Sequence, residues 1–244
     1  MIKPRPLCLQ VFGRPAGQRW VISDVHGHCQ TLKALVTDQI QLTKSDQLFL
    51  LGDYIDRGPD NAGVIDFILE LQQTGHQVYG ILGNHEDNLI QEFELHRQSQ
   101  PRLSWIKFIE AIDLLDEHQN IHPTYFQWLT SLPYYIELDH FYLVHAGFRF
   151  DSPYPFADHD AMLRIRGFQQ NPTDKTIIHG HKPTDLNLIE AKIQQRQNII
   201  PLDNGCYAAR SLRENGIPPS LWQRGKLLAL ELDTWQLLSQ ENIG

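Results

Sequence analysis

The N-terminal third of the chain alternates short hydrophobic runs with segments whose apolar residues recur every three to four positions. Residues 20–22, 47–51 and 77–82 predict buried strands, while residues 32–40 and 60–73 have the spacing of amphipathic helices. Each helical segment is long enough to carry the chain back for a parallel strand, a crossover that is nearly always right-handed. Residues 1–85 therefore predict a β-α-β-α-β arrangement with parallel strands.

The pattern changes twice further along. Residues 86–133 predict mainly helices, with inward contacts at Leu89, Phe93, Ile106, Ile109, Phe126 and Leu129. After Pro133 the hydrophobic runs return and predict strands at 135–138, 141–144, 176–178, 198–202, 227–232 and 235–238. Asp139 and His140 predict a two-residue hairpin turn between the first two of these strands. The later strands predict a second sheet packed against the first.

No linker or internal repeat divides the chain of 244 residues, so we expect a single domain over 1–244 with a largely helical segment at about 86–133. A content of 41% hydrophobic and 20% charged residues is typical of a soluble globular protein. The net charge of -8 argues against nucleic acid as a partner, because such binding depends on Lys and Arg.

The cysteines and the hydrophobic runs bear on the compartment. Cys8, Cys29 and Cys206 form no Cys-x-x-Cys pair, which favours free thiols in a reducing environment. No run resembles a signal-peptide core or approaches the roughly 18 apolar residues of a membrane span. We therefore expect a cytoplasmic protein without a membrane partner, while the oligomeric state is not written in the sequence.

Short polar fragments stand where the hydrophobic strands end. They are Asp-Val-His-Gly at 24–27, Gly-Asp-Tyr-Ile-Asp-Arg-Gly at 52–58, Gly-Asn-His-Glu at 83–86, His-Ala-Gly at 145–147 and Gly-His at 180–181. Carboxylate oxygens, an amide oxygen and imidazole nitrogens together suit borderline-hard cations such as Mn, Fe or Zn. Open α/β sheets bind ligands beyond the carboxyl ends of their strands, where Asp24, Asp53 and Asn84 fall.

The fragments differ in how much each indicates by itself. Asp24 and His26 project to the same side of an extended chain, but an Asp-x-His pair alone fits a solvated loop better than a metal site. Asn84 can ligate a metal without adding charge, and the adjacent His85 would point elsewhere and be available for proton transfer. Together with Asp53 and His145, which also follow strands, these residues predict a metal-dependent hydrolase of phosphate esters.

Taken in order, the five fragments resemble the phosphoprotein phosphatase family of calcineurin-like metallophosphoesterases, in its compact bacterial form. The resemblance covers most of residues 20–205 and implies an α/β fold, a metallophosphoesterase-type β-sandwich of two mixed sheets flanked by α-helices. It implies two divalent metal ions, with Mn favoured over Fe, Zn or Mg. The implied ligands are Asp24, His26 and Asp53 for one metal and Asp53, Asn84, His145 and His181 for the other, so that Asp53 bridges.

The resemblance also implies a mechanism. Two cations roughly 3.5–4 Å apart can activate a bridging hydroxide for in-line displacement at phosphorus, so no protein nucleophile is needed. In this scheme His85 protonates the leaving group and Asp56 orients His85, while Arg57, Arg166 and Asn84 contact the substrate phosphate. Arg164 competes with Arg166 for the second arginine position, and His179 competes with His181 as the late ligand. Asp203 follows a strand in a similar loop but is not counted among the ligands.

We expect the chain to be a metal-dependent protein serine/threonine phosphatase, acting on a phosphorylated protein or a small phosphoester. The alternative is a dinucleoside polyphosphate hydrolase of the symmetrical diadenosine tetraphosphatase type, or a broad-specificity phosphoesterase. A catalytically silent binding module is a third hypothesis, but such a module would not need to keep Asp56 and His85. Substrate choice should depend on residues 86–133 and 148–160, where several aromatic side chains could stack on a base.

Overall fold

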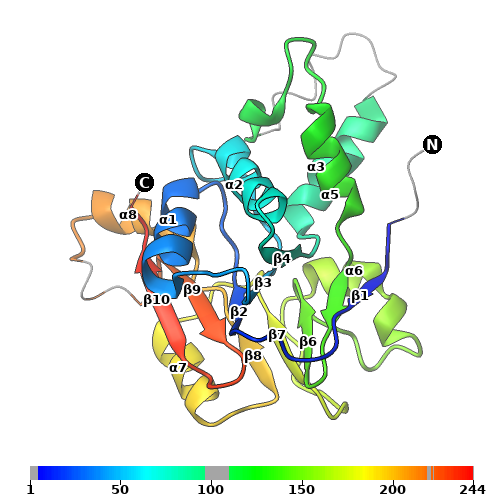
Figure 1. Cartoon of the computed structure of the whole chain (residues 1–244), viewed down its shortest axis with the longest axis vertical. Helices are drawn as coiled ribbons and strands as arrows, with labels where there is room; N and C mark the ends of the chain where they lie inside the picture. Colours follow the sequence, from blue (N-terminus) through cyan, green and yellow to red (C-terminus); the bar gives the residue numbers. More distant parts are fainter. Residues whose placement is uncertain (1–4, 97–109, 219–220, 222, 244) are drawn as a thin grey trace.

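Two five-stranded mixed sheets pack into a sandwich in the computed structural model, which describes residues 5–96, 110–218, 221 and 223–243 (Figure 1). The first sheet has the order β10 (Leu237–Glu241), β9 (Lys226–Glu231), β2 (Arg19–Ile22), β3 (Gln47–Leu50) and β4 (Gln77–Gly80). The second has the order β1 (Cys8–Gln10), β5 (Tyr135–Glu137), β6 (Phe141–Val144), β7 (Thr176–His179) and β8 (Ile199–Pro201). The predicted α/β sandwich of two mixed sheets is confirmed.

Alternation along the strands of the first sheet divides its hydrophobic residues between two cores. Val21 and Phe49 belong to a cluster that also contains Leu143 and Ile178 of the second sheet. The neighbouring positions of the same strands, such as Leu48, belong to a second cluster shared with the helices. Because successive side chains of a strand point to opposite faces, the central strands β2 and β3 are buried on both sides.

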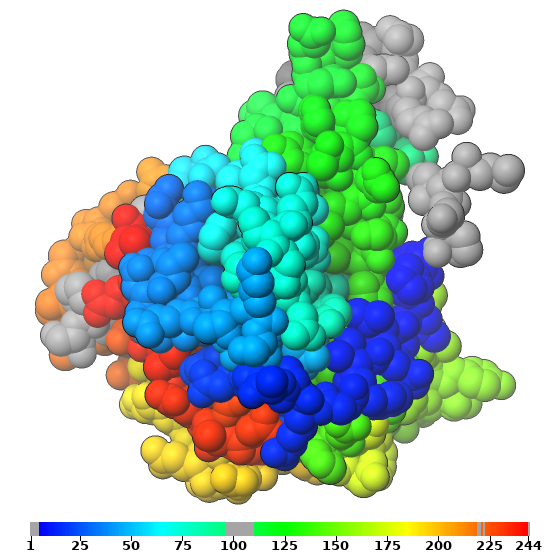
Figure 2. All heavy atoms as spheres, in the orientation of Figure 1, coloured from blue at the N-terminus to red at the C-terminus, as the bar shows by residue number. Residues whose placement is uncertain are grey.

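Helices cover the first sheet and extend beyond the sandwich. They are α1 (Cys29–Ala34), which continues into the π-helical η1 (Leu35–Ile40), α2 (Asn61–Gln73), α3 (Asn84–His96) and α5 (Pro123–Ser131). Asp60 begins α2 as its cap, because its Oδ1 accepts a hydrogen bond from the backbone N of Gly63 at 2.9 Å. Figure 2 shows α5 and the turn before it projecting from the body of the molecule. No helix in the described ranges is long and apolar enough to cross a bilayer.

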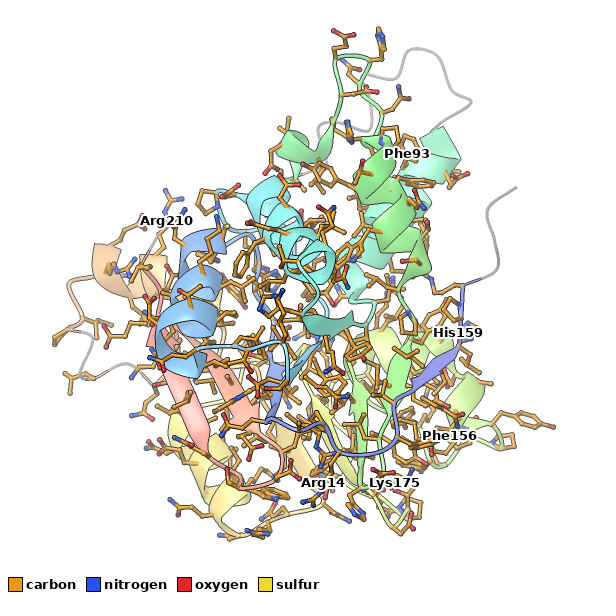
Figure 3. All side chains as sticks on the ribbon, viewed as in Figure 1. Arg14, Phe93, Phe156, His159, Lys175 and Arg210 are labelled. Atoms are coloured by element: carbon orange, nitrogen blue, oxygen red, sulfur yellow. The ribbon has the colours of Figure 1, made fainter. Side chains whose placement is uncertain are left out.

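Shorter helices lie around both sheets and beside α2. They are η2 (Ile112–Leu114), η3 (Pro155–Ala157), α6 (His159–Arg164), α7 (Leu186–Gln194), η4 (Cys206–Ala208) and α8 (Ala209–Glu214). Figure 3 places His159 near β1, whereas Phe93 lies in the helical part above the sandwich. Phe156 packs against Tyr142 of β6, with ring centroids 5.2 Å apart. The side chains of Ile189 and Ile193 on α7 join the core between the sheets.

Most predicted strands are confirmed to within a residue or two, and the hairpin at Asp139 and His140 is confirmed by the Leu138 N to Phe141 O hydrogen bond of 2.9 Å. The strand predicted at 235–238 is shifted, because β10 runs Leu237–Glu241. Glu231 causes the shift: its Oε2 accepts hydrogen bonds from the backbone N of Asp233 and Thr234 and forms a turn there. The expected inward contacts at Ile106 and Ile109 lie outside the described residues.

Candidate metal centre and active site

Six strands end at one edge of the sandwich, three from each sheet. In the first sheet Asp24 follows β2, Asp53 follows β3 and Asn84 follows β4; in the second, His145 follows β6, His181 follows β7 and Asp203 follows β8. Strands β2, β3 and β4 are parallel to one another, as are β6, β7 and β8, so their carboxyl ends meet. A polar cavity of about 50 Å³ lies there, lined by His26, Asp53, Arg57, Asn84, His85, Arg166, His181, Pro183, Asp203 and Tyr207.

Asp53 lies at the centre of this site and is buried. Its Oδ2 is 3.7 Å from Nε2 of His26 and 3.9 Å from Nε2 of His85, and its Oδ1 is 3.4 Å from Nε2 of His145. Burial favours the neutral acid, but attraction from these three imidazoles outweighs it and lowers the pKa of Asp53 to about 2. Asp53 therefore offers an ionised carboxylate to both sides of the site.

Backbone carbonyls orient two of the imidazoles. Nδ1 of His26 lies 3.0 Å from the carbonyl oxygen of Ile55, and Nδ1 of His145 lies 2.8 Å from that of Leu51. Since only an N–H can donate to a carbonyl, each Nε2 faces Asp53 with its lone pair, the arrangement found at metal-ligating histidines. Burial also lowers the pKa of His26 to about 4, so its ring is neutral.

Asn84 joins the two histidines of the second sheet. Its Oδ1 is 3.0 Å from Nε2 of His145 and 2.8 Å from Nδ1 of His181. Burial lowers the pKa of His181 to about 4, which keeps this ring neutral as well. One carbonyl oxygen and two neutral imidazole nitrogens thus converge beside Asp53. The potential ligand atoms of Asp53, His145 and His181 all lie within 4.8 Å of one another.

Asp24 completes the arrangement as a buried carboxylate. Its Oδ2 accepts a hydrogen bond from the backbone N of His181 at 2.9 Å, while its Oδ1 has no hydrogen-bond partner in the described part of the chain. Burial and the charges of Asp203 and Asp53 raise the pKa of Asp24 well above its usual range. A buried, unpartnered carboxylate oxygen near neutral imidazoles and a second carboxylate fits a site for divalent cations.

Unusual backbone conformations concentrate in these loops. Five non-glycine residues of the site have left-handed φ angles, namely His26 (49°), Asp53 (50°), Asp56 (68°), Arg57 (71°) and His181 (68°). Such conformations cost of order 1–3 kcal/mol each and persist only where the surroundings enforce them. The loops after β2 and β3 also approach so closely that a Cβ on Gly58 would collide with the backbone oxygen of His26. Holding these side chains in position therefore lowers the free energy of unfolding.

Glu86 holds the loop after β3 in place. Its carboxylate is fully buried and accepts hydrogen bonds from the backbone N of Asp53 (2.9 Å), Tyr54 (2.8 Å), Ile55 (3.2 Å) and Gly83 (3.0 Å). Burial and the charge of Asp53 raise the pKa of Glu86 to about 8. Sequence reasoning gave no role to Glu86, although its place in the Gly-Asn-His-Glu fragment could have indicated one.

His85 and Asp56 form a hydrogen-bonded pair at the rim of the cavity. Nδ1 of His85 lies 2.6 Å from Oδ2 of Asp56, which leaves Nε2 facing the site. Burial alone would lower the pKa of His85, but the hydrogen bond to Asp56 and the charge of Asp53 raise it above its ordinary value. This histidine is therefore suited to carry a proton near pH 7, unlike the buried rings of His26 and His181.

The structure separates the two competing arginines. Arg166 lines the cavity, as does Arg57, whose guanidinium lies 4.2 Å from the ring centre of Tyr207. Arg164 instead points to α3, where it bonds Oδ2 of Asp87 at 2.6 Å and Oδ1 of Asn88 at 2.7 Å.

The competing histidines are separated in the same way. The ring of His179 packs near Phe168, with its Nδ1 3.0 Å from the carbonyl oxygen of Gly180, whereas His181 reaches Asn84.

Three further residues line the cavity without having been counted in the predicted site, namely Pro183, Asp203 and Tyr207. Asp203 is buried, and burial together with the charge of Asp53 raises its pKa to about 7 even though its Oδ1 accepts the backbone N–H of Gly205 at 2.6 Å. Tyr207 packs edge-on against His26, with ring centroids 5.2 Å apart. No pattern in the sequence marks Tyr207, whereas Asp203 follows β8 just as the other predicted site residues follow their strands.

Residues 18–218 match the family of calcineurin-like phosphoesterases, a span that contains all the residues of this site. The chain belongs to this family. Calcineurin-like phosphoesterases use divalent metal ions, in agreement with the two groups of candidate ligands that share Asp53.

Curated relatives of this phosphoesterase include enzymes named symmetrical bis(5'-nucleosyl)-tetraphosphatases. The one from Erwinia tasmaniensis is 33% identical over 132 residues, which are 52% of this chain and 43% of that protein. The one from Buchnera aphidicola of Schizaphis graminum is 32% identical over 96 residues, 39% of this chain and 34% of that protein. The chain thus spans less than half the length of these relatives.

Solved structures share the fold of this phosphoesterase over nearly its whole length. One, suggested to be a diadenosine tetraphosphatase, has a TM-score of 0.66 at 20% identity and covers 98% of this chain and 99% of its own. A protein serine/threonine phosphatase from Saccharomyces cerevisiae has a TM-score of 0.60 at 12% identity and covers 98% and 85%. At such identities the likeness shows the fold alone.

Proposed function

We propose that this calcineurin-like phosphoesterase uses two divalent cations to hydrolyse dinucleoside polyphosphates symmetrically, with simpler phosphate esters as poorer substrates. The observation that carries the proposal is the pair of candidate ligand groups that share one carboxylate: Asp53 with His26 and His85 in one, and Asp53 with His145 and His181 in the other. Asp24 belongs with the first group and Asn84 with the second. Two cations sharing a carboxylate are the arrangement that stabilises in-line displacement at phosphorus.

The proposed ligands are those that the five sequence fragments imply, and the grouping of the donor atoms around Asp53 supports them. Asp24, His26 and Asp53 would hold one cation, and Asp53, Asn84, His145 and His181 the other. When bound, such a pair lowers the pKa of water and attracts the phosphoryl oxygens. His85 also lies near Asp53, but its Nδ1 is engaged by Asp56 and its raised pKa favours the protonated ring, so we keep it apart from the ligands.

The remaining residues bind phosphate and move a proton. Arg57 and Arg166 line the cavity from different loops, and their guanidinium groups would each donate two hydrogen bonds to phosphate oxygens. The amide of Asn84 also faces this space. Nε2 of His85 would donate a proton to the leaving oxygen, while Asp56 keeps the ring oriented and charged.

The choice of substrate class is supported by the curated relatives, which are named for symmetrical cleavage of bis(5'-nucleosyl) tetraphosphates. The serine/threonine phosphatase reading expected from the sequence has support only from structures below 25% identity, which carry the fold and not the substrate. The alternative reading is therefore the better supported. Cleavage of a dinucleoside polyphosphate also depends less on protonation of the leaving group, since a nucleoside diphosphate leaves as a weaker base than a serine alkoxide.

A steady-state comparison of diadenosine tetraphosphate with a phosphoserine peptide tests the proposal. Manganese-loaded protein should show kcat/KM at least tenfold higher for the dinucleotide, and chromatography should detect ADP alone as product, because one water added at the central anhydride gives two ADP. Metal-stripped protein is the control. A preference for the peptide, or release of ATP with AMP, would contradict the proposal.

A further inference from the structure

A second hollow adjoins the catalytic cavity. It has a volume of about 300 Å³, and its lining includes Phe168, Lys182, Pro183, Leu188, Lys192 and Arg224. We refer to this hollow as the cationic groove. Pro183 lines both the groove and the catalytic cavity, so the two spaces meet at this residue.

Two chain segments pass directly from one space to the other. Arg166 lines the catalytic cavity and the next residues, Gly167 and Phe168, line the groove. In the same way His181 lines the cavity and Lys182 lines the groove. Consecutive residues of each segment, whose Cα atoms are about 3.8 Å apart, therefore border the two spaces in turn. A substrate with a chain of phosphates could occupy both.

The groove is positively charged in a protein that is acidic overall. Its lining contains the cations Lys182, Lys192 and Arg224 and the single carboxylate of Asp185, while the chain has a net charge of -8. Arg224 Nε bonds Oδ1 of Asp185 at 2.7 Å and Lys192 Nζ donates to Gln197 at 2.7 Å. Lys182 is exposed and pairs with no carboxylate among the described residues. A local surplus of positive charge favours an anionic ligand.

Apolar side chains accompany these cations. Phe168, Pro183 and Leu188 border the groove. Phe168 and Pro183 are half-buried, and Leu188 is 51% exposed. A ligand made of phosphates alone has no apolar part to pack against these side chains. A nucleoside attached to phosphates does, because its base and sugar bury apolar area. The face of an aromatic ring such as Phe168 is also a common platform for a base.

We propose that the cationic groove binds one nucleoside diphosphate arm of a dinucleoside polyphosphate. Lys182 and Arg224 contact the phosphates beyond the bond that is cleaved, and Phe168, Pro183 and Leu188 pack against the nucleoside. This inference rests on the proposed function and adds the residues that distinguish a dinucleotide from a simple phosphate ester. The roles proposed above for His85, Asp56 and the metal ligands stay the same.

The test is calorimetric binding of ADP and of pyrophosphate to the manganese-loaded protein. Wild-type protein should bind ADP more tightly than pyrophosphate, and Lys182→Gln should raise the Kd for ADP about fivefold or more, with a similar rise in Arg224→Gln. Lys44→Gln is the matched control, because it removes the same charge from an exposed residue just before β3, at the opposite end of that strand from the site. Its Kd for ADP should equal that of the wild type.

Unchanged ADP affinity in Lys182→Gln, or ADP binding no tighter than pyrophosphate, would overturn the inference. The inference would also be overturned if Lys182→Gln weakened binding of a phosphoserine peptide more than binding of ADP, since the groove would then recognise a peptide. The two proposals can fail separately. If the protein does not hydrolyse the dinucleotide but its ADP binding depends on Lys182, only the proposed function is contradicted. If it hydrolyses the dinucleotide but its ADP binding does not depend on Lys182, only the role of the cationic groove is contradicted.

Discussion

Nδ1 of His85 lies 2.6 Å from Oδ2 of Asp56, and this contact turns the other ring nitrogen toward the catalytic cavity. If His85 protonates the leaving group, its removal must matter most when that group is a strong base. His85→Asn should lower kcat for phenyl phosphate by about 100-fold or more, and for p-nitrophenyl phosphate by much less, because nitrophenolate leaves without a proton. Steady-state rates with the two substrates measure this difference.

Asp56→Asn serves as the companion variant to His85→Asn. It should show the same dependence on the leaving group with a smaller loss, and adding it to His85→Asn should cost little more, since the two residues act as one unit. Equal losses for both phenyl substrates would show that His85 acts in another way, for example as a metal ligand.

Arg166 and Arg164 provide a matched pair that tests the assignment of the phosphate-binding arginine. Arg166→Ala should lower kcat/KM for p-nitrophenyl phosphate by about tenfold or more, since it removes a bidentate contact to the phosphate. Arg164→Ala should leave kcat/KM within about threefold, because Arg164 is engaged by Asp87 and Asn88 on α3. The reverse order of effects would reassign the two residues.

The pairing of Arg19 with Asp233 predicts a pH-dependent contribution to stability away from the site. Arg19 is buried and bonds both carboxylate oxygens of Asp233, at 3.1 and 2.7 Å, and this contact lowers the pKa of Asp233. Arg14, at the lower edge of the sandwich in Figure 3, adds a further contact to Asp233 at 3.2 Å. Asp233→Asn should cost about 2 kcal/mol in the free energy of unfolding at pH 7.

The sign of the pH dependence follows from the lowered pKa. The carboxylate contributes fully above its unfolded pKa of about 3.9, and its contribution disappears as the pH falls through the lower folded value. Urea unfolding at pH 7 and near pH 3.5 should therefore show wild type and Asp233→Asn converging in acid. A difference that stays constant or grows in acid would show that the charge of Asp233 is not what stabilises the fold.

The fold was predictable where periodicity and strand-end chemistry agreed. The strands β2, β3 and β4 were found because they are short hydrophobic runs, and the helix α2 because its apolar residues recur every three to four positions. Strand β1 was missed because it has only three residues at a sheet edge, and so short an element depends on tertiary contacts that a local pattern does not contain. Helix α7 was missed although Leu186, Ile189 and Ile193 have the spacing of an amphipathic helix.

The site was predictable as a set of residues but not as a geometry. Strand-end position identified Asp24, Asp53 and Asn84, whereas the choice between Arg164 and Arg166 depended on which way each side chain points. Glu86 was missed because its role is to accept backbone N–H groups from a loop about thirty residues away. Long-range hydrogen bonds of this kind leave no trace in the spacing of a single sequence.

Metal content is the most direct test of the shared carboxylate. After removal of metal with a chelator and reconstitution with manganese, elemental analysis of wild-type protein should give two ions per chain. Asp53→Asn should retain at most one, and Lys44→Gln should retain both. Wild-type protein that binds no manganese, or Asp53→Asn that still binds two ions, would contradict a two-cation centre built around Asp53.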